Sequence, residues 1–292
     1  MSVQVVAPID ILEAALDHLG QVVQFSPAVR GPSHVVVTVT GVEQSSAPAA
    51  FGRYLVGALA GAVGIDAQLS EQLLARGVDR REEMRRTVLS LIGKSNDFPT
   101  EEDELFRDMR RNAWMGEGVG HALLMLSARH KTTCVDGQIC ALAEVHQTPT
   151  RQGLDSVGMY VQADVLGVAI GENKTTCSYA SKNLGEAIKL FVEVERGVHG
   201  PDLRAKLSAF RYVLPSHLQD QVKDALWTDN ASYLPMIVYQ DEYDFLRERP
   251  TLAKLGQPLE RRRVIVVRLS GFHAFFDAVA DAMRAAVEEV VV

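Results

Sequence analysis

The sequence has few cysteines, no long apolar run and no excess of positive charge, and each shortage argues against a class of protein. Cysteine occurs only three times in 292 residues, at Cys134, Cys140 and Cys177, which is too few for a disulfide framework and odd in number. The N-terminus lacks a basic stretch followed by an apolar core, so no secretory signal peptide is expected. We therefore expect reduced thiols and a cytoplasmic protein.

Long apolar segments are interrupted by glycine or charge, as in residues 54–65, and none reaches the roughly 20 residues that a membrane-spanning helix needs. The net charge of −7 argues against a protein that coats nucleic acid through bulk charge, although it leaves room for a local basic groove. What is present, 47% hydrophobic and 23% charged residues, predicts a folded chain with a substantial core.

The pattern of the first hundred residues is mostly helical. A β-branched run over 34–40 predicts a strand, and apolar spacing predicts helices over 51–65 and within 69–95. An acidic, proline-containing connection follows from Ser95. We place a soft boundary there, with an accessory or regulatory part over 1–98 and a mixed α/β part over 99–292.

The second part has the composition of an α/β sheet with flanking helices. Thr100 and Ser181 are candidate N-caps, and residues 148–153 are a predicted loop. In chain order the pattern predicts a helix, three strands, a helix, two strands and a closing helix, over 103–128, 137–147, 154–162, 165–174, 181–195, 234–240, 262–269 and 271–290.

The predicted hairpin brings acidic residues from two strands together. With its turn at Ala163 and Asp164, Asp155 lies almost opposite Glu172, and cross-strand partners have Cβ atoms about 5 Å apart. Lys174 is two residues beyond Glu172 and points to the same face. Asp164 lies at the turn, too far from Glu172 to share a cation.

This arrangement of residues suits a divalent metal. Carboxylate oxygens from Asp155 and Glu172, with the main-chain carbonyl of Asn173, are hard ligands for Mg²⁺ or Mn²⁺. Glu117, flanked by small residues on the preceding helix, is a candidate third carboxylate. Lys174 could orient a metal-activated water or stabilise a pentavalent phosphorus, which predicts phosphodiester cleavage by Glu117, Asp155, Glu172 and Lys174.

The motifs LDSVGMY (154–160) and AIGENK (169–174), with a helix before and after them, resemble the PD-(D/E)XK nuclease superfamily. The resemblance implies a restriction-endonuclease-like core, in which a central mixed sheet is flanked by helices. The proline in the superfamily's name is absent, because Gly153 and Leu154 precede Asp155.

Within that superfamily, the chain is similar to the HamA nuclease subunits of Hachiman anti-phage defence systems. The similarity extends over HVVVTVTG, the helix with Gly116 and Glu117, GLDSVGMY, IGENK, PMIVYQDEY and VIVVRLSGF. It implies a Mg²⁺-dependent DNA endonuclease with Glu117, Asp155, Glu172 and Lys174 in its site. It also implies a helicase or ATPase partner, of the HamB kind, that restrains the nuclease until unusual DNA appears.

Other interpretations of the same residues stay open. Glu172 and Lys174 could form an ordinary ion pair, and the chain could be an inactive scaffold or nucleic-acid sensor of the same fold. A zinc-binding module is a third possibility, although the spacing of His130, Cys134, Cys140 and His146 matches no common zinc pattern. Gly116, Gly118 and Gly120 are better explained by helix packing than by phosphate binding. Candidate phosphate contacts are Arg107, Arg110, Arg111, Lys182 and Lys189.

Overall fold

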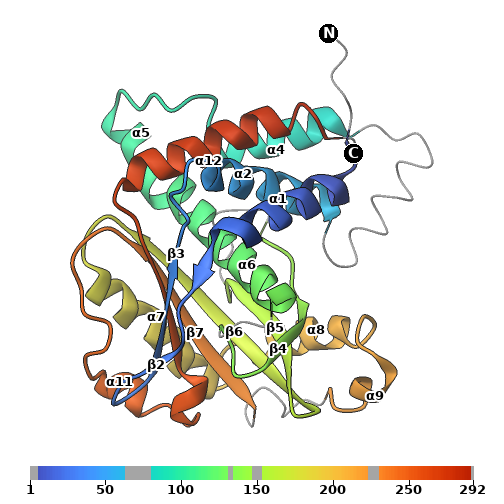
Figure 1. The fold of residues 1–292 in the computed structure, drawn as a ribbon, viewed down its shortest axis with the longest axis vertical. Coiled ribbons are helices and arrows are strands. Elements are labelled where there is room, and N and C mark those ends of the chain that lie inside the picture. The colour runs from blue at the N-terminus through green and yellow to red at the C-terminus, as the bar shows by residue number, and fades with distance from the viewer. Residues whose placement is uncertain (1–5, 63–79, 131–133, 147–152, 223–229, 291–292) are drawn as a thin grey trace.

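The computed structural model describes residues 6–62, 80–130, 134–146, 153–222 and 230–290. It is an α/β structure in which helices cover a mixed β-sheet (Figure 1). The predicted fold class is therefore confirmed at this level. Most of the predicted loop over 148–153, and parts of the helices predicted over 51–65 and 69–95, lie outside the described residues.

The sheet has the strand order β1-β3-β8-β7-β6-β5-β4, with β2 also paired to β3. Neighbours from β3 to β6 are parallel, whereas β4, β5 and β6 form an antiparallel meander and β1 and β2 run antiparallel to β3. Strands that precede residue 98 in the sequence and strands that follow it thus belong to one sheet. Their bounds are β1 Gln24–Phe25, β2 Val29–Arg30, β3 Val35–Thr40, β4 Gln138–Leu142, β5 Ser156–Gln162, β6 Val165–Thr176, β7 Ala231–Tyr239 and β8 Arg263–Arg268.

Helices lie on both faces of this sheet (Figure 1). None of those in the described ranges is both long and apolar enough to cross a membrane. Their bounds are α1 Pro8–Val22, α2 Ala47–Gly57, η1 Ala58–Ala62, α4 Arg81–Ile92, α5 Glu101–Phe106, η2 Arg107–Arg111, α6 Asn112–His130, α7 Ala180–Glu195, α8 Gly200–Phe210, α9 Ser216–Gln219, α11 Pro250–Ala253, η3 Leu259–Arg261 and α12 Phe272–Ala286.

Each face of the sheet has its own hydrophobic core. On one face α6 packs against the sheet and shares a core with α1, α2 and α12, and on the other face α7 and α8 pack against the sheet. The alternation of side chains along β6 separates the two cores, because Val168 and Ile170 belong to the α7 core and Ala169 to the α6 core. The same alternation continues into the polar end of β6.

Glycines let α6 approach β6 closely. A Cβ atom on Gly116 would lie 1.8 Å from Thr175 Oγ1, and one on Gly120 would lie 1.9 Å from Asn173 Oδ1. A Cβ atom on Gly118 would meet Leu55 of α2 at 2.2 Å. The predicted helix-packing role of these glycines is confirmed, and their spacing holds α6 directly over the polar end of β6.

The two predicted N-caps have different outcomes. Thr100 caps α5 through a capping box, since its side chain accepts from the backbone N–H of Asp103 and the Asp103 carboxylate accepts from the N–H of Thr100. The prediction for Ser181 is wrong, because α7 begins one residue earlier and Tyr179 occupies the N-cap. The first-turn amide of Ala180 instead donates to Asp241 at 3.3 Å.

Candidate metal centre

The β5–β6 hairpin has the predicted register. Its turn residues, Ala163 and Asp164, have φ angles of 47° and 65°, as a two-residue type I′ turn requires. The ladder pairs Gln162 with Val165 and continues to Ser156 opposite Gly171. One step further along this register, Asp155 lies opposite Glu172.

Asp155 ends the ladder by using its side chain. Its Oδ2 accepts a hydrogen bond of 2.8 Å from the backbone N–H of Asn173. In an extended strand the N–H and C=O of one residue point to the same neighbouring strand, so the Asn173 carbonyl also points toward this edge. That orientation agrees with the predicted role of the carbonyl as a metal ligand. The Asn173 side chain lies on the face of the sheet that α6 covers, where it packs against Gly120.

Glu172 and Lys174 form an ion pair at the buried end of β6. Lys174 Nζ lies 2.8 Å from Glu172 Oε1, and the exposed fractions of the two side chains are 29% and 7%. Within the described part of the chain, the second oxygen of Glu172, Oε2, is buried and accepts from no N–H or hydroxyl donor, and the neighbouring Asp155 carboxyl can bond Glu172 only if the two share a proton. A buried carboxylate oxygen without a donor is costly unless a proton or a cation satisfies it.

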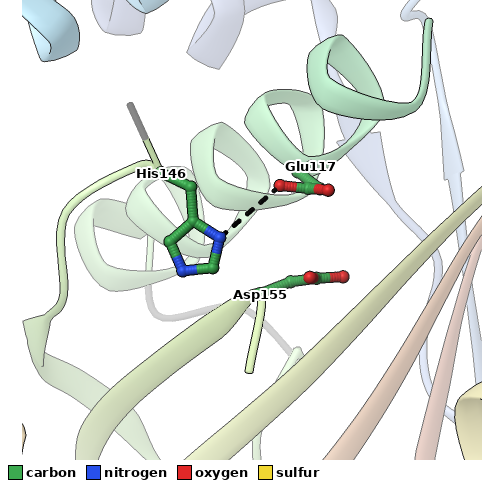
Figure 2. Close-up of side chains that lie close together, drawn as sticks. All are labelled: Glu117, His146 and Asp155. Atoms are coloured by element: carbon green, nitrogen blue, oxygen red, sulfur yellow. Dashed lines mark ion pairs between the residues drawn. The ribbon is translucent and has the colours of Figure 1, made fainter. Parts of the chain in front are cut away.

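Glu117 enters the same site from α6. Oxygen atoms of Glu117 and Asp155 and a ring nitrogen of His146 all lie within 4.8 Å of one another, and the three side chains point together (Figure 2). His146 Nδ1 is 3.8 Å from Glu117 Oε2. Asp155 therefore lies between the Glu117–His146 pair on one side and the Glu172–Lys174 pair on the other.

The carboxyl groups raise one another's pKa. Burial, and then the charges of Asp155 and Glu172, raise the pKa of Glu117 to about 9. Burial and the charge of Asp155 raise the pKa of Glu172 to about 8. Burial likewise raises the pKa of Asp155, although the Asn173 amide and Lys174 oppose it. Lys174 cannot neutralise three carboxylates, so at neutral pH the site takes up protons or a cation.

Lys174 itself stays charged. Burial would lower its pKa, but the charges of Glu172, Asp155 and Glu186 and the hydrogen bond to Glu172 together outweigh burial, and the net effect is a raised pKa. An ammonium that is protonated at neutral pH serves as a positive charge and hydrogen-bond donor. Lys174 is therefore suited to contact an anion or hold a water molecule, and unsuited to act as a general base.

Two residues near the site were not assigned to it from the sequence. His146 was considered only as a zinc ligand, because nothing in its local spacing connects it to Glu117. Lys206, on α8, donates to the Leu154 carbonyl at 3.3 Å and pairs with Asp202 at 3.1 Å. It fixes the backbone next to Asp155, and its charge opposes the rise in the pKa of Asp155. A basic side chain 52 positions along the chain gives no sequence signal for this contact.

The zinc alternative does not form among the described residues, where no group of three or more potential metal ligands includes Cys134 or Cys140. Cys134 is fully buried, and burial raises the pKa of its thiol to about 12. It is a core residue. His146 lies instead with Glu117 and Asp155.

The predicted phosphate contacts are only partly accessible. Arg111 is fully buried and bonds Asp277 at 2.6 Å, so that prediction is wrong. Arg107 pairs with Asp108 at 2.8 Å. Arg110, Lys182 and Lys189 are exposed, and for them phosphate contact stays a prediction.

No protein-family model matches the chain, and a search of curated proteins finds no match either. Residue motifs and site geometry are therefore what a functional proposal can rest on. The geometry is a partly buried group of three carboxylates with one ammonium and one imidazole at the end of a β-hairpin.

Proposed function

We propose that the chain is a metal-dependent nuclease that hydrolyses DNA phosphodiester bonds. The observation that carries this proposal is the convergence of Glu117, Asp155 and Glu172 with a charged Lys174. Their raised pKa values and the unsatisfied Glu172 oxygen indicate a site built to receive positive charge. The residues lie where β5 begins, beside the stretch of β6 that extends past β5 and is still paired with β7.

A Mg²⁺ or Mn²⁺ ion is the group that best fits these oxygen donors. Glu117, Asp155 and Glu172 would hold it, with the Asn173 carbonyl as a further ligand. When bound, the ion would lower the pKa of a coordinated water and neutralise charge on the phosphate.

The protein residues account for the remaining steps. Lys174 holds the attacking water in line with the phosphorus and stabilises the charge that develops on the phosphate oxygens. The water oxygen bonds to phosphorus, one P–O ester bond breaks, one proton of the water passes to solvent, and the departing ester oxygen takes a proton from solvent. Gly116 and Gly120 keep α6 close enough for Glu117 to reach the site.

The core of this nuclease would be of the PD-(D/E)XK kind, and within that superfamily its motifs resemble those of the HamA subunits of Hachiman defence systems. Helix α6 with Glu117 comes first in the chain, the β5–β6 hairpin with Asp155, Glu172 and Lys174 comes next, and helix α7 follows. This is the order of elements that the resemblance implies. On that basis we propose an anti-phage effector that works with a helicase or ATPase partner. Helices α1, α2 and α4 would form the surface through which the partner regulates the nuclease.

The proposal is tested by incubating the purified chain with supercoiled and linear DNA and Mg²⁺ or Mn²⁺, alone and with any ATPase that co-purifies. We expect cleavage by the wild type, and loss of cleavage in Glu172→Ala and Lys174→Ala. Lys254→Ala, which removes an exposed lysine just after α11, is the matched control for removal of a lysine. Equal cleavage by wild type, Glu172→Ala and Lys174→Ala would show that the site is not the source of the activity.

A further inference from the structure

We propose that His146 is a ligand of the metal and makes the site prefer a transition-series cation to Mg²⁺. This inference rests on the metal centre of the proposed function and adds to it a nitrogen ligand. The His146 ring nitrogen lies within 4.8 Å of the carboxylate oxygens of Glu117 and Asp155, and the side chain is 6% exposed. Figure 2 shows the imidazole directed at the two carboxylates.

The backbone that carries His146 is held in place by α6. Trp114 Nε1 donates to the His146 carbonyl at 2.7 Å, and His121 Nε2 bonds the Ala143 carbonyl at 2.8 Å. Trp114, Glu117 and His121 are spaced three and four residues apart, so one face of the helix carries both anchors and the carboxylate between them. Helix α6 thus positions both Glu117 and His146, two of the proposed metal ligands.

The tautomer of His121 follows from its partners. Burial lowers the pKa of His121 to about 4, so the ring is neutral. A carbonyl can only accept, which places the proton on Nε2 and leaves Nδ1 to accept from the hydroxyl of Tyr54 at 2.5 Å. The fully buried Tyr54 of α2 thereby fixes the anchor that holds the Ala143 carbonyl.

The ligand chemistry determines which metal the site selects. Mg²⁺ takes oxygen ligands almost exclusively, whereas imidazole suits first-row transition metals. A site of carboxylates, one carbonyl and one imidazole should therefore hold Mn²⁺ more tightly than Mg²⁺. The nitrogen contact should account for a large part of that difference.

The test uses Mn²⁺ and Mg²⁺ themselves as probes of the full-length protein. Mn²⁺ bound to the wild type should show electron spin-echo modulation from a coordinated ¹⁴N nucleus, and His146→Gln should lose it. Calorimetry should show at least about tenfold weaker Mn²⁺ binding in His146→Gln. Mg²⁺ binding should change by less than about threefold, because Mg²⁺ gains little from imidazole.

His217→Gln is the matched control, since His217 is exposed on α9 and should leave both measurements unchanged. The spin-echo experiment on wild type needs no variant, so it decides the proposal even if His146→Gln fails to fold. Mn²⁺ binding without nitrogen coupling, or equal losses for both metals, would overturn the role of His146. Nitrogen coupling in a protein that cleaves no DNA would support His146 as a metal ligand and contradict the nuclease proposal.

Discussion

Individual residues determine the electrostatics of the site. Three carboxyl groups from α6, the start of β5 and β6 share one lysine, and the pKa of Glu117 and of Glu172 rises to about 9 and about 8. Without a metal, the folded site holds protons at neutral pH in place of three full negative charges. A cation that displaces the protons would therefore bind more tightly as the pH rises.

The metal-free protein should lose stability as the pH increases. Glu117 has a higher pKa folded than unfolded, so its contribution is full below about pH 4.5 and disappears as the pH rises through about 9. The loss is at most about 1.4 kcal/mol per pH unit for each such carboxyl. Urea unfolding in EDTA between pH 5.5 and 8.5 measures it.

Glu117→Gln is the variant that isolates this effect, because an amide stays neutral over the whole range. Its free energy of unfolding should depend less steeply on pH than that of the wild type. Added Mn²⁺ should restore the stability of the wild type most strongly at pH 8.5. Equal slopes for the two proteins would contradict the raised pKa of Glu117.

Among the secondary-structure elements, α6 is the one that assembles the site. It carries Glu117, anchors the segment over 143–146, and packs on β6 through Gly116 and Gly120. Any change that lifts the helix from the sheet should separate Glu117 from Asp155.

Gly120→Ala should have that effect. Its Cβ atom would lie 1.9 Å from Asn173 Oδ1, so the helix or the buried asparagine must move, at a cost of about 1–3 kcal/mol. Calorimetry should show weaker Mn²⁺ binding, and thermal unfolding a lower midpoint. Gly185→Ala on α7 is the control, because its Cβ would meet nothing within 4 Å. That variant should keep its metal affinity and its stability, and equal effects of both would refute the packing argument.

The sequence predicted the elements better than their ends. The hairpin was predictable because residues 163 and 164 separate two alternating runs, and its register followed from the turn. The strand expected over 137–147 ends at Leu142, because side chains of α6 hold the next carbonyls. Ser181 was expected to cap α7, but the Asp241 carboxylate accepts the first-turn amide instead. Contacts of this kind depend on tertiary structure and leave no local pattern.

The site was predictable to the same extent. Asp155, Glu172 and Lys174 follow from hairpin register, and the position of Glu117 was inferred from its glycine neighbours. His146 and Lys206 join them only through folding, since neither has a fixed spacing to the motif. For Arg111 the sequence predicts a phosphate contact that the structure excludes. Nothing in the run of arginines shows which of them is buried.

In the whole molecule, Arg111 joins parts that are distant in sequence. Its guanidinium bonds Asp277 of α12 at 2.6 Å and Asn96 at 3.0 Å, and lies 4.7 Å from the centre of the Phe98 ring. These contacts fasten η2, the connection before α5 and the last helix together. They hold the helical layer together at residues that are not part of the candidate metal centre.

Asp277→Ala should destabilise the fold and spare the site. It leaves a fully buried guanidinium without its carboxylate, which should cost roughly 3 kcal/mol in the free energy of unfolding. Asp220→Ala, which removes an exposed partner of Arg211, should cost less than about 1 kcal/mol. Chemical denaturation measures both, and a loss below that of Asp220→Ala would contradict the structural role. Folded Asp277→Ala should bind Mn²⁺ as the wild type does.

The central claim, that this carboxylate–lysine site hydrolyses phosphodiester bonds with a bound cation, is tested most directly by the rate of supercoiled DNA cleavage as Mn²⁺ is titrated. The rate should be zero in EDTA and saturate with Mn²⁺ for the wild type. In Lys174→Ala it should fall by roughly 10²–10⁴-fold, while calorimetry shows that Mn²⁺ still binds. Cleavage that persists in EDTA, or an unchanged rate in Lys174→Ala, would contradict the account.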